Sequence, residues 1–287
     1  MKVIFDVAEK LELPVTRSWY MYGSYVWSDY ATESRMNDFW SIPESDPSIK
    51  DTIEQARTAK KDLFAQIKRL VEDHELMLDI PLSDFLDKLY ERAPRRYRNV
   101  YKTHKKVLLR FRSISELSRS CIPEPQLLKC SRDITAFQKE MLVFNEFPDM
   151  VDLVIEHTSF MEDLMVRFDE SLDEPVRLQS LISFFKDAYE AYRNKTWTFP
   201  PSLITIENIT GDNKETVIET RKRHMSQLPY YMDLPDIWRE KAFSGNFYPS
   251  YEGILESQKK LAVNSGNSER FLKEYFTRQR EPAARQD

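Results

Sequence analysis

Residues 97–114 have the sequence YRNVYKTHKKVLLRFRSI, in which apolar side chains recur every three or four positions. That spacing places them on one face of an α-helix, which has about 3.6 residues per turn. The residues of this stripe are Tyr97, Val100, His104, Val107, Phe111 and Ile114. The pattern predicts a helix that is opened by Pro94 and buries one face in a core.

The same spacing recurs through most of the chain. It predicts a long helix over residues 47–78, a short one over residues 81–92, and further helices after Gln126, Pro148 and Pro175. Amphipathic helices joined by proline-containing connections bury their apolar faces against one another. The sequence therefore predicts an all-α fold, a multi-helix bundle.

The C-terminal third shows a different pattern. Apolar and polar side chains alternate over residues 203–219, on both sides of Gly211-Asp212-Asn213, which predicts a small β-hairpin. Residues 229–252 are rich in aromatic residues and proline, and we expect them to be irregular. Residues 269–279 predict a last helix.

Three regions follow from these patterns. We expect an aromatic N-terminal segment over residues 1–45 that packs on the bundle, and the helical bundle itself over residues 46–200. The predicted hairpin, the irregular aromatic segment and the C-terminal helix occupy residues 201–287. A chain of 287 residues is long enough to bury a large core.

The composition excludes several classes of protein. With 41% hydrophobic and 31% charged residues, and with Asp6 and Glu9 inside the apolar N-terminal stretch, we expect a globular cytoplasmic protein without a signal peptide or membrane span. The five glycines are scattered, so a phosphate-binding loop is not predicted. Two cysteines and four histidines lack the spacing of metal ligands, so we expect neither a metal nor another cofactor.

One short stretch has the residue types of a reaction centre. Arg98-Asn99-Val-Tyr-Lys-Thr-His104 resembles the motif of HEPN ribonucleases, helical bundles that dimerise so that arginine and histidine from both copies line a cleft. The resemblance implies metal-independent RNA cleavage with His104 as general acid or base, Arg98 stabilising the phosphorane and Asn99 orienting the site. The alternative is that His104 is a packed core residue, because it lies on the apolar stripe and about 120° around the helix from Arg98.

Residues 92–112, the basic segment, contain nine Lys or Arg and no acid, although the formal net charge of the chain is -5. Cations interleaved with tyrosines are typical of a surface that neutralises phosphates and stacks on bases. The candidate nucleic-acid-binding residues are Arg95, Arg96, Tyr97, Lys102, Lys105, Lys106 and Arg110. The alternative is internal pairing with residues 140–174, which carry eleven acids and a single arginine.

Aromatic residues crowd the N-terminal segment. The candidate interface residues are Trp19, Tyr20, Tyr22, Tyr25 and Trp27. Such residues are enriched both at protein interfaces and at the edge of a core, and both interpretations stay open. We expect a non-enzymatic binding or regulatory protein that acts through a protein partner or self-association. The alternatives are a HEPN-like ribonuclease and nucleic-acid binding without catalysis.

Overall fold

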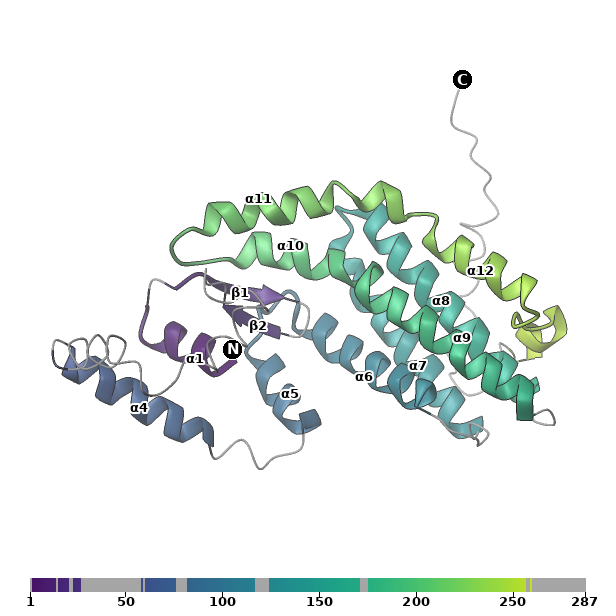
Figure 1. Cartoon of the computed structure of the whole chain (residues 1–287), viewed down its shortest axis with the longest axis horizontal. Helices are drawn as coiled ribbons and strands as arrows, with labels where there is room; N and C mark the ends of the chain where they lie inside the picture. Colours follow the sequence, from purple (N-terminus) through teal and green to yellow (C-terminus); the bar gives the residue numbers. More distant parts are fainter. Residues whose placement is uncertain are drawn as a thin grey trace, which may run out of the picture. The chain divides into compact units, whose positions relative to one another are not determined.

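The fold is mostly helical, with helix over 81% of the residues that the structure describes, which confirms the predicted class (Figure 1). The structure is a computed structural model. It describes residues 2–13, 15–20, 23–26, 58, 60–75, 82–116, 124–170, 175–256 and 259. Within these residues, no helix is both long enough and apolar enough to cross a membrane.

Two compact units make up the chain. Unit 1 contains residues 1–102 and 197–229, and unit 2 contains residues 103–196 and 230–287. Each unit therefore combines two stretches that are far apart in the sequence. The predicted boundary after residue 45 lies outside the described residues, and the predicted boundary at residue 200 falls inside a helix.

Unit 1 combines short helices with one pair of strands. Its elements are α1 (Lys2–Lys10), β1 (Arg17–Tyr20), β2 (Gly23–Val26), α4 (Lys61–Glu75), α5 (Leu82–Glu91), the first residues of α6 (Arg98–Ser115), α10 (Phe199–Asn208) and α11 (Lys214–Met225). The 3-10 turns η2 (Thr196–Thr198) and η3 (Leu228–Tyr231) flank the second stretch. The strands pair antiparallel, with Arg17 opposite Val26, and β1 packs beside α10 (Figure 1).

The predicted hairpin over residues 203–219 is wrong, because α10 and α11 occupy this stretch. Pro200 and Pro201 lie in the first turn of α10. Proline is tolerated there because the N–H groups of the first helical turn have no hydrogen-bond partner within the helix. Nearly every side chain of α10 up to Thr205 is buried, so the helix shows no amphipathic period in its sequence. The strands of this fold lie instead near the N-terminus.

The predicted turn at Gly211 exists, but it joins two helices. Gly211 has φ +99°, and a Cβ at this position would collide with the backbone of Val15. Next to it, Thr210 exchanges two backbone hydrogen bonds with Arg17, of 2.9 and 3.0 Å. The turn between α10 and α11 therefore continues the strand pair on the side of β1.

Unit 2 is a helical bundle. It contains the rest of α6, α7 (Glu124–Met141), η1 (Leu142–Phe144), α8 (Pro148–Glu170), α9 (Pro175–Asn194) and α12 (Leu234–Ser244). Helix α8 packs against α7 on one side and against α9 and α12 on others (Figure 1). The apolar residues predicted for these helices form the core, and all six residues of the α6 stripe are buried.

The longest predicted helix is described only in part. Helix α4 covers residues 61–75 of the predicted 47–78, and residues 47–57, 59 and 76–78 lie outside the described part. Helix α5 confirms the short helix predicted over residues 81–92. The helix predicted over residues 269–279 also lies outside the described residues.

Candidate functional site

The residues of the HEPN-like motif belong to one helix, α6, of which Arg98 and Asn99 belong to unit 1 and His104 to unit 2. The imidazole of His104 is 2% exposed and lies in the aromatic core of unit 2, with ring centroids 5.1 Å from Phe137 and 5.9 Å from Tyr192. Burial lowers the pKa of His104 well below its ordinary range, so the ring is neutral at pH 7. Arg98 belongs to unit 1, where it pairs with Glu91 at 3.9 Å.

A general acid or base must reach the atom whose proton it transfers. The burial of His104 agrees with the packed-core alternative, and the role of Asn99, which is exposed, has no support from this geometry. The catalytic assignment stays a prediction. We expect a gel assay to show no metal-independent RNA cleavage. Cleavage that persists in chelator, is lost in both His104→Ala and Arg98→Ala, and is kept in Lys60→Ala would establish the catalytic assignment.

The cations of the basic segment are largely used inside the fold. Six of the nine form ion pairs among the described residues. These pairs are Arg92 with Glu9 (2.6 Å), Arg96 with Glu207 (3.7 Å), Arg98 and Lys102 with Glu91, Arg110 with Asp133 (3.2 Å) and Arg112 with Glu116 (2.7 Å). Each of these acids lies outside residues 140–174. The six cations therefore pair with acids other than those that the internal-pairing alternative named. Nucleic-acid binding stays a prediction.

The other four candidate residues of the basic segment differ in exposure. Tyr97 and Lys105 are buried, and the Tyr97 hydroxyl donates a hydrogen bond to Glu207. Arg95 and Lys106 are exposed. A base can stack on a tyrosine only where its ring face is accessible, so the Tyr97 ring is not placed for this role.

Among the five candidate interface residues of the N-terminal segment, the side chains of two are described. Trp19 is buried and packs against Phe5 and Tyr101, with ring centroids 5.9 and 5.7 Å away. Tyr20 is half-buried, and Arg221 both lies over its ring at 4.0 Å and donates a 2.7 Å hydrogen bond to its hydroxyl. Trp19 therefore belongs to the core of unit 1. The side chains of Tyr22, Tyr25 and Trp27 lie outside the described residues.

Most of the large apolar side chains that are exposed among the described residues lie instead in one stretch of unit 2. Of the eight large hydrophobic side chains that are exposed among the described residues, five lie between positions 230 and 255. We call these five the C-terminal surface: Tyr230, Ile237, Phe243, Tyr251 and Leu255. The side chains of Tyr230, Tyr251 and Phe243 are the most open, at 86%, 72% and 63% exposure.

Aromatic packing fixes this segment to the bundle. Leu234 and Ala242 are spaced so that both face inward from α12, and both are buried. From α9, the Phe184 ring lies between two rings of the segment, 5.4 Å from Trp238 and 5.0 Å from Phe247. Helix α12 and the turn after it therefore hold a defined position on α8 and α9.

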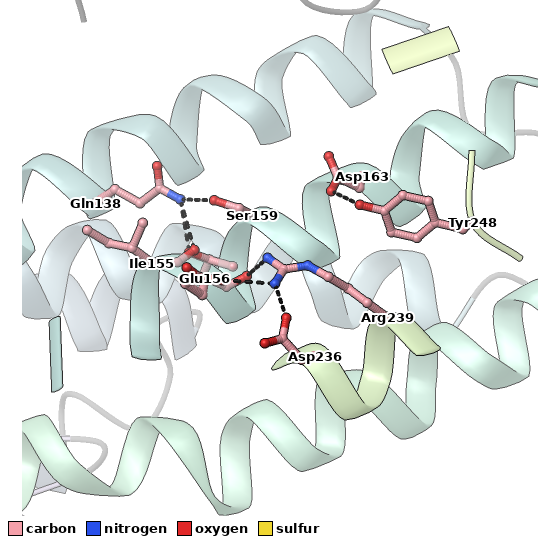
Figure 2. A network of polar contacts seen from close by, with 9 residues as sticks. Gln138, Ile155, Glu156, Ser159, Asp163, Asp236, Arg239 and Tyr248 are labelled. Carbon is pink, nitrogen blue, oxygen red and sulfur yellow. Dashed lines mark hydrogen bonds and ion pairs between the residues drawn. The ribbon is translucent and has the colours of Figure 1, made fainter. Parts of the chain in front are cut away.

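Polar contacts hold the same segment on α8 (Figure 2). Arg239 donates to Glu156 at 2.8 Å and to Asp236 at 2.6 Å, and the Tyr248 hydroxyl donates to Asp163 at 2.7 Å. Gln138 of α7 donates to the hydroxyls of Thr158 and Ser159 on α8, 3.0 and 3.1 Å away, and Figure 2 shows the bond to Ser159. The bonds of Arg239 to Glu156 and Asp236, and of Tyr248 to Asp163, are charge-assisted. Charge-assisted hydrogen bonds are the stronger ones in proteins, and these favour one orientation of α12.

The pKa values along α8 reflect this packing. Burial raises the pKa of Asp163 to about 6, while the hydrogen bond from Tyr248 opposes the rise. Burial also raises the pKa of Glu162 to about 7, opposed by a hydrogen bond with Ser131.

Tyr248 connects the polar contacts to the C-terminal surface. Its ring stacks on Phe243 at a centroid distance of 4.3 Å. Tyr251 and Leu255 are one helical turn apart on residues 251–256 and so share a face. The exposed rings are therefore presented by a segment whose inner side is fixed.

The irregular structure expected for residues 229–252 is wrong over α12. The sequence contained a signal for this helix, because Leu234, Trp238 and Ala242 recur every four residues and Pro235 lies in the first turn. The clustering of aromatic residues and prolines in this stretch obscured that spacing.

Comparison with known proteins gives one family. The sequence profile of a family described as a domain of unknown function (DUF8098) matches residues 2–258, so the chain belongs to this family. No curated protein and no solved structure matches the chain.

Proposed function

We propose that the protein acts by binding another protein through its C-terminal surface and that it is not itself an enzyme. The proposal rests on the concentration of exposed apolar side chains in residues 230–255. Scattered single hydrophobic residues are normal on a protein surface, whereas several within one short segment are typical of an interaction site.

The anchoring of the segment supports the same function. Binding costs conformational entropy, and this cost is smaller when the surface is already ordered in the free protein. Phe184, Arg239 and Tyr248 fix the inner side of the segment, so Phe243 and Tyr251 are available as preformed aromatic contacts. Burying apolar area on a partner contributes about 25 cal/mol per Å², and aromatic residues supply much area with few rotatable bonds.

Site-specific photocrosslinking in cells tests the proposal. A photoreactive phenylalanine analogue replaces Tyr251 in the full chain, and the crosslinked product is identified by mass spectrometry, purified and titrated against the protein. We expect a defined partner whose crosslink at position 251 is lost in Phe243→Ser.

Leu142 provides the matched control, because it is an exposed apolar residue of unit 2 on η1, at 54% exposure. The analogue at position 142 should not give the same product, and Leu142→Ser should leave the crosslink at position 251 intact. The same set of products from both positions, or a crosslink that is insensitive to Phe243→Ser, contradicts the proposal.

A further inference from the structure

The stretch that carries the C-terminal surface has a negative net charge. Residues 230–256 contain five carboxylates and two basic side chains, Arg239 and Lys241. Among the carboxylates, Asp233, Glu240 and Glu252 are exposed, and the exposed Lys259 follows one helical turn after Leu255. Exposed acids therefore outnumber exposed cations over residues 230–259.

Both cations of residues 230–256 have partners in unit 2. Arg239 lies between Glu156 and Asp236, with donor–acceptor distances of 2.8 and 2.6 Å. The exposed Lys241 ammonium lies over the Trp238 ring, 4.6 Å from its centroid. From α9, Arg177 donates to the backbone oxygen of Asn246 at 3.2 Å. A partner thus meets exposed carboxylates and exposed aromatic side chains, while part of the positive charge already has a partner.

This combination selects for a cationic partner. Lys and Arg side chains pair with carboxylates and also pack on the faces of tyrosine and phenylalanine, whose rings attract cations. A nucleic acid is disfavoured at this surface, because its phosphates would face Asp233, Glu240 and Glu252. From the exposed rings and the acidic border together, we infer that the C-terminal surface binds a Lys/Arg-rich segment of a partner protein. This inference rests on the proposed protein-binding function.

Three synthetic peptides test the inference on the full chain. They share one pattern of leucine and alanine and carry Lys/Arg, Gln or Glu at every other position, and fluorescence anisotropy measures their affinity. We expect the basic peptide to bind at least about tenfold more tightly than the Gln peptide, and the Glu peptide to bind most weakly. The affinity of the basic peptide should fall as ionic strength rises, because salt screens exposed charges.

Two double variants separate charge from apolar contact. Glu240→Lys/Glu252→Lys should lower the affinity for the basic peptide by about tenfold or more and leave the affinity for the Gln peptide nearly unchanged. Glu146→Lys/Asp149→Lys makes the same change of net charge at exposed acids of unit 2 near the start of α8 and should leave the basic peptide within about twofold of the wild type. Phe243→Ser/Tyr251→Ser should weaken both peptides.

The outcomes distinguish the inference from the function on which it rests. Equal binding of all three peptides, lost in Phe243→Ser/Tyr251→Ser, overturns the preference for a basic partner and supports a protein-binding surface of another specificity. Basic-peptide binding that is weakened equally by both charge reversals also overturns the inference, because it then reflects net charge alone. Binding that is unaffected by Phe243→Ser/Tyr251→Ser counts against the proposed function itself. Absence of binding by any peptide overturns the inference, and the crosslinking experiment then decides the function separately.

Discussion

The basic segment and the C-terminal surface show opposite relations between composition and exposure. The basic segment has the strongest local charge in the chain, yet its apolar stripe is buried and six of its cations pair with acids of the fold. Residues 230–255 carry a smaller net charge than the basic segment and present five exposed apolar side chains. Residue type alone therefore does not determine which side chains are available to a partner, because some of them already interact with other residues of the same fold.

The comparison predicts its largest effect in the core that α6 helps to form. Phe111 is fully buried, and its ring packs edge-on against Phe185, Tyr189 and Tyr192 at centroid distances of 5.8 to 6.1 Å. Phe111→Ala should lower the free energy of unfolding by about 3 to 5 kcal/mol, as loss of a buried aromatic ring does elsewhere. Urea denaturation followed by circular dichroism measures the change. Leu109→Ala, at an exposed position of the same helix, should cost far less, and equal costs would contradict a structural role for the stripe.

A smaller effect is expected where the C-terminal surface is fastened. Arg239→Ala removes hydrogen bonds to Glu156 and Asp236 and leaves the half-buried Glu156 carboxylate without this cation. Because these bonds are charge-assisted, the variant should lose about 1.5 to 3 kcal/mol of stability. It should also weaken crosslinking at Tyr251, since α12 is less well held. Lys186→Ala, an exposed position on α9, serves as the control, and a stable Arg239→Ala with unchanged crosslinking would show that the contact does not position the surface.

The pH dependence of stability should reveal Glu162. Its pKa of about 7 in the folded chain lies above the ordinary 4.5, so between these values the folded state keeps a proton that the unfolded state has lost. Rising pH through this window therefore lowers stability, and Glu162→Gln should remove about 1 to 3 kcal/mol of that decrease. Denaturation over this window, with exposed Glu190→Gln as the control, measures it. Parallel curves for Glu162→Gln and the wild type would contradict the assignment.

His157 should act in the opposite direction. Burial lowers its pKa from 6.5 to about 3, so below pH 6.5 the unfolded chain takes up a proton that the folded chain does not bind. Stability should therefore fall as pH drops through this window. In His157→Asn, whose amide can keep the 2.8 Å hydrogen bond that the Nδ1 atom makes with Thr196, the acid-side decrease should become shallower. An unchanged slope would show that His157 does not control it.

The smallest effect is expected at the rim of the basic segment. Arg110 pairs with Asp133 at 3.2 Å, so Arg110→Ala should cost about 1 kcal/mol or less, while exposed Lys106→Ala should cost almost nothing. Neither variant should change the affinity for a single-stranded RNA oligonucleotide, which we expect to be weak throughout. Tight, salt-sensitive RNA binding that falls in both variants would reverse the comparison between the two regions.

The helical periods explain why much of unit 2 was predictable. Stripes such as Leu178, Leu181, Phe185 and Tyr189 mark an inward face because only one side of α9 meets the core. In α10 this signal fails, since Leu203, Ile204 and Thr205 are buried in succession and leave no polar face to define the period. The candidate interface residue Trp19 was misleading for a related reason, because an aromatic side chain serves a core edge as well as a surface.

The sequence by itself determined the helical class and the buried face of α6, because a repeat of three and four residues admits one regular structure with one apolar side. It also determined the position of the turn at Gly211, where φ +99° and the close approach of Val15 exclude other residues. Tertiary structure decided that Glu9, Asp133 and Glu207 pair with cations of the basic segment, because acids far away in the sequence meet them only after folding. It likewise decided that Phe243 and Tyr251 stay exposed, since burial depends on which neighbours cover a side chain and not on its own chemistry.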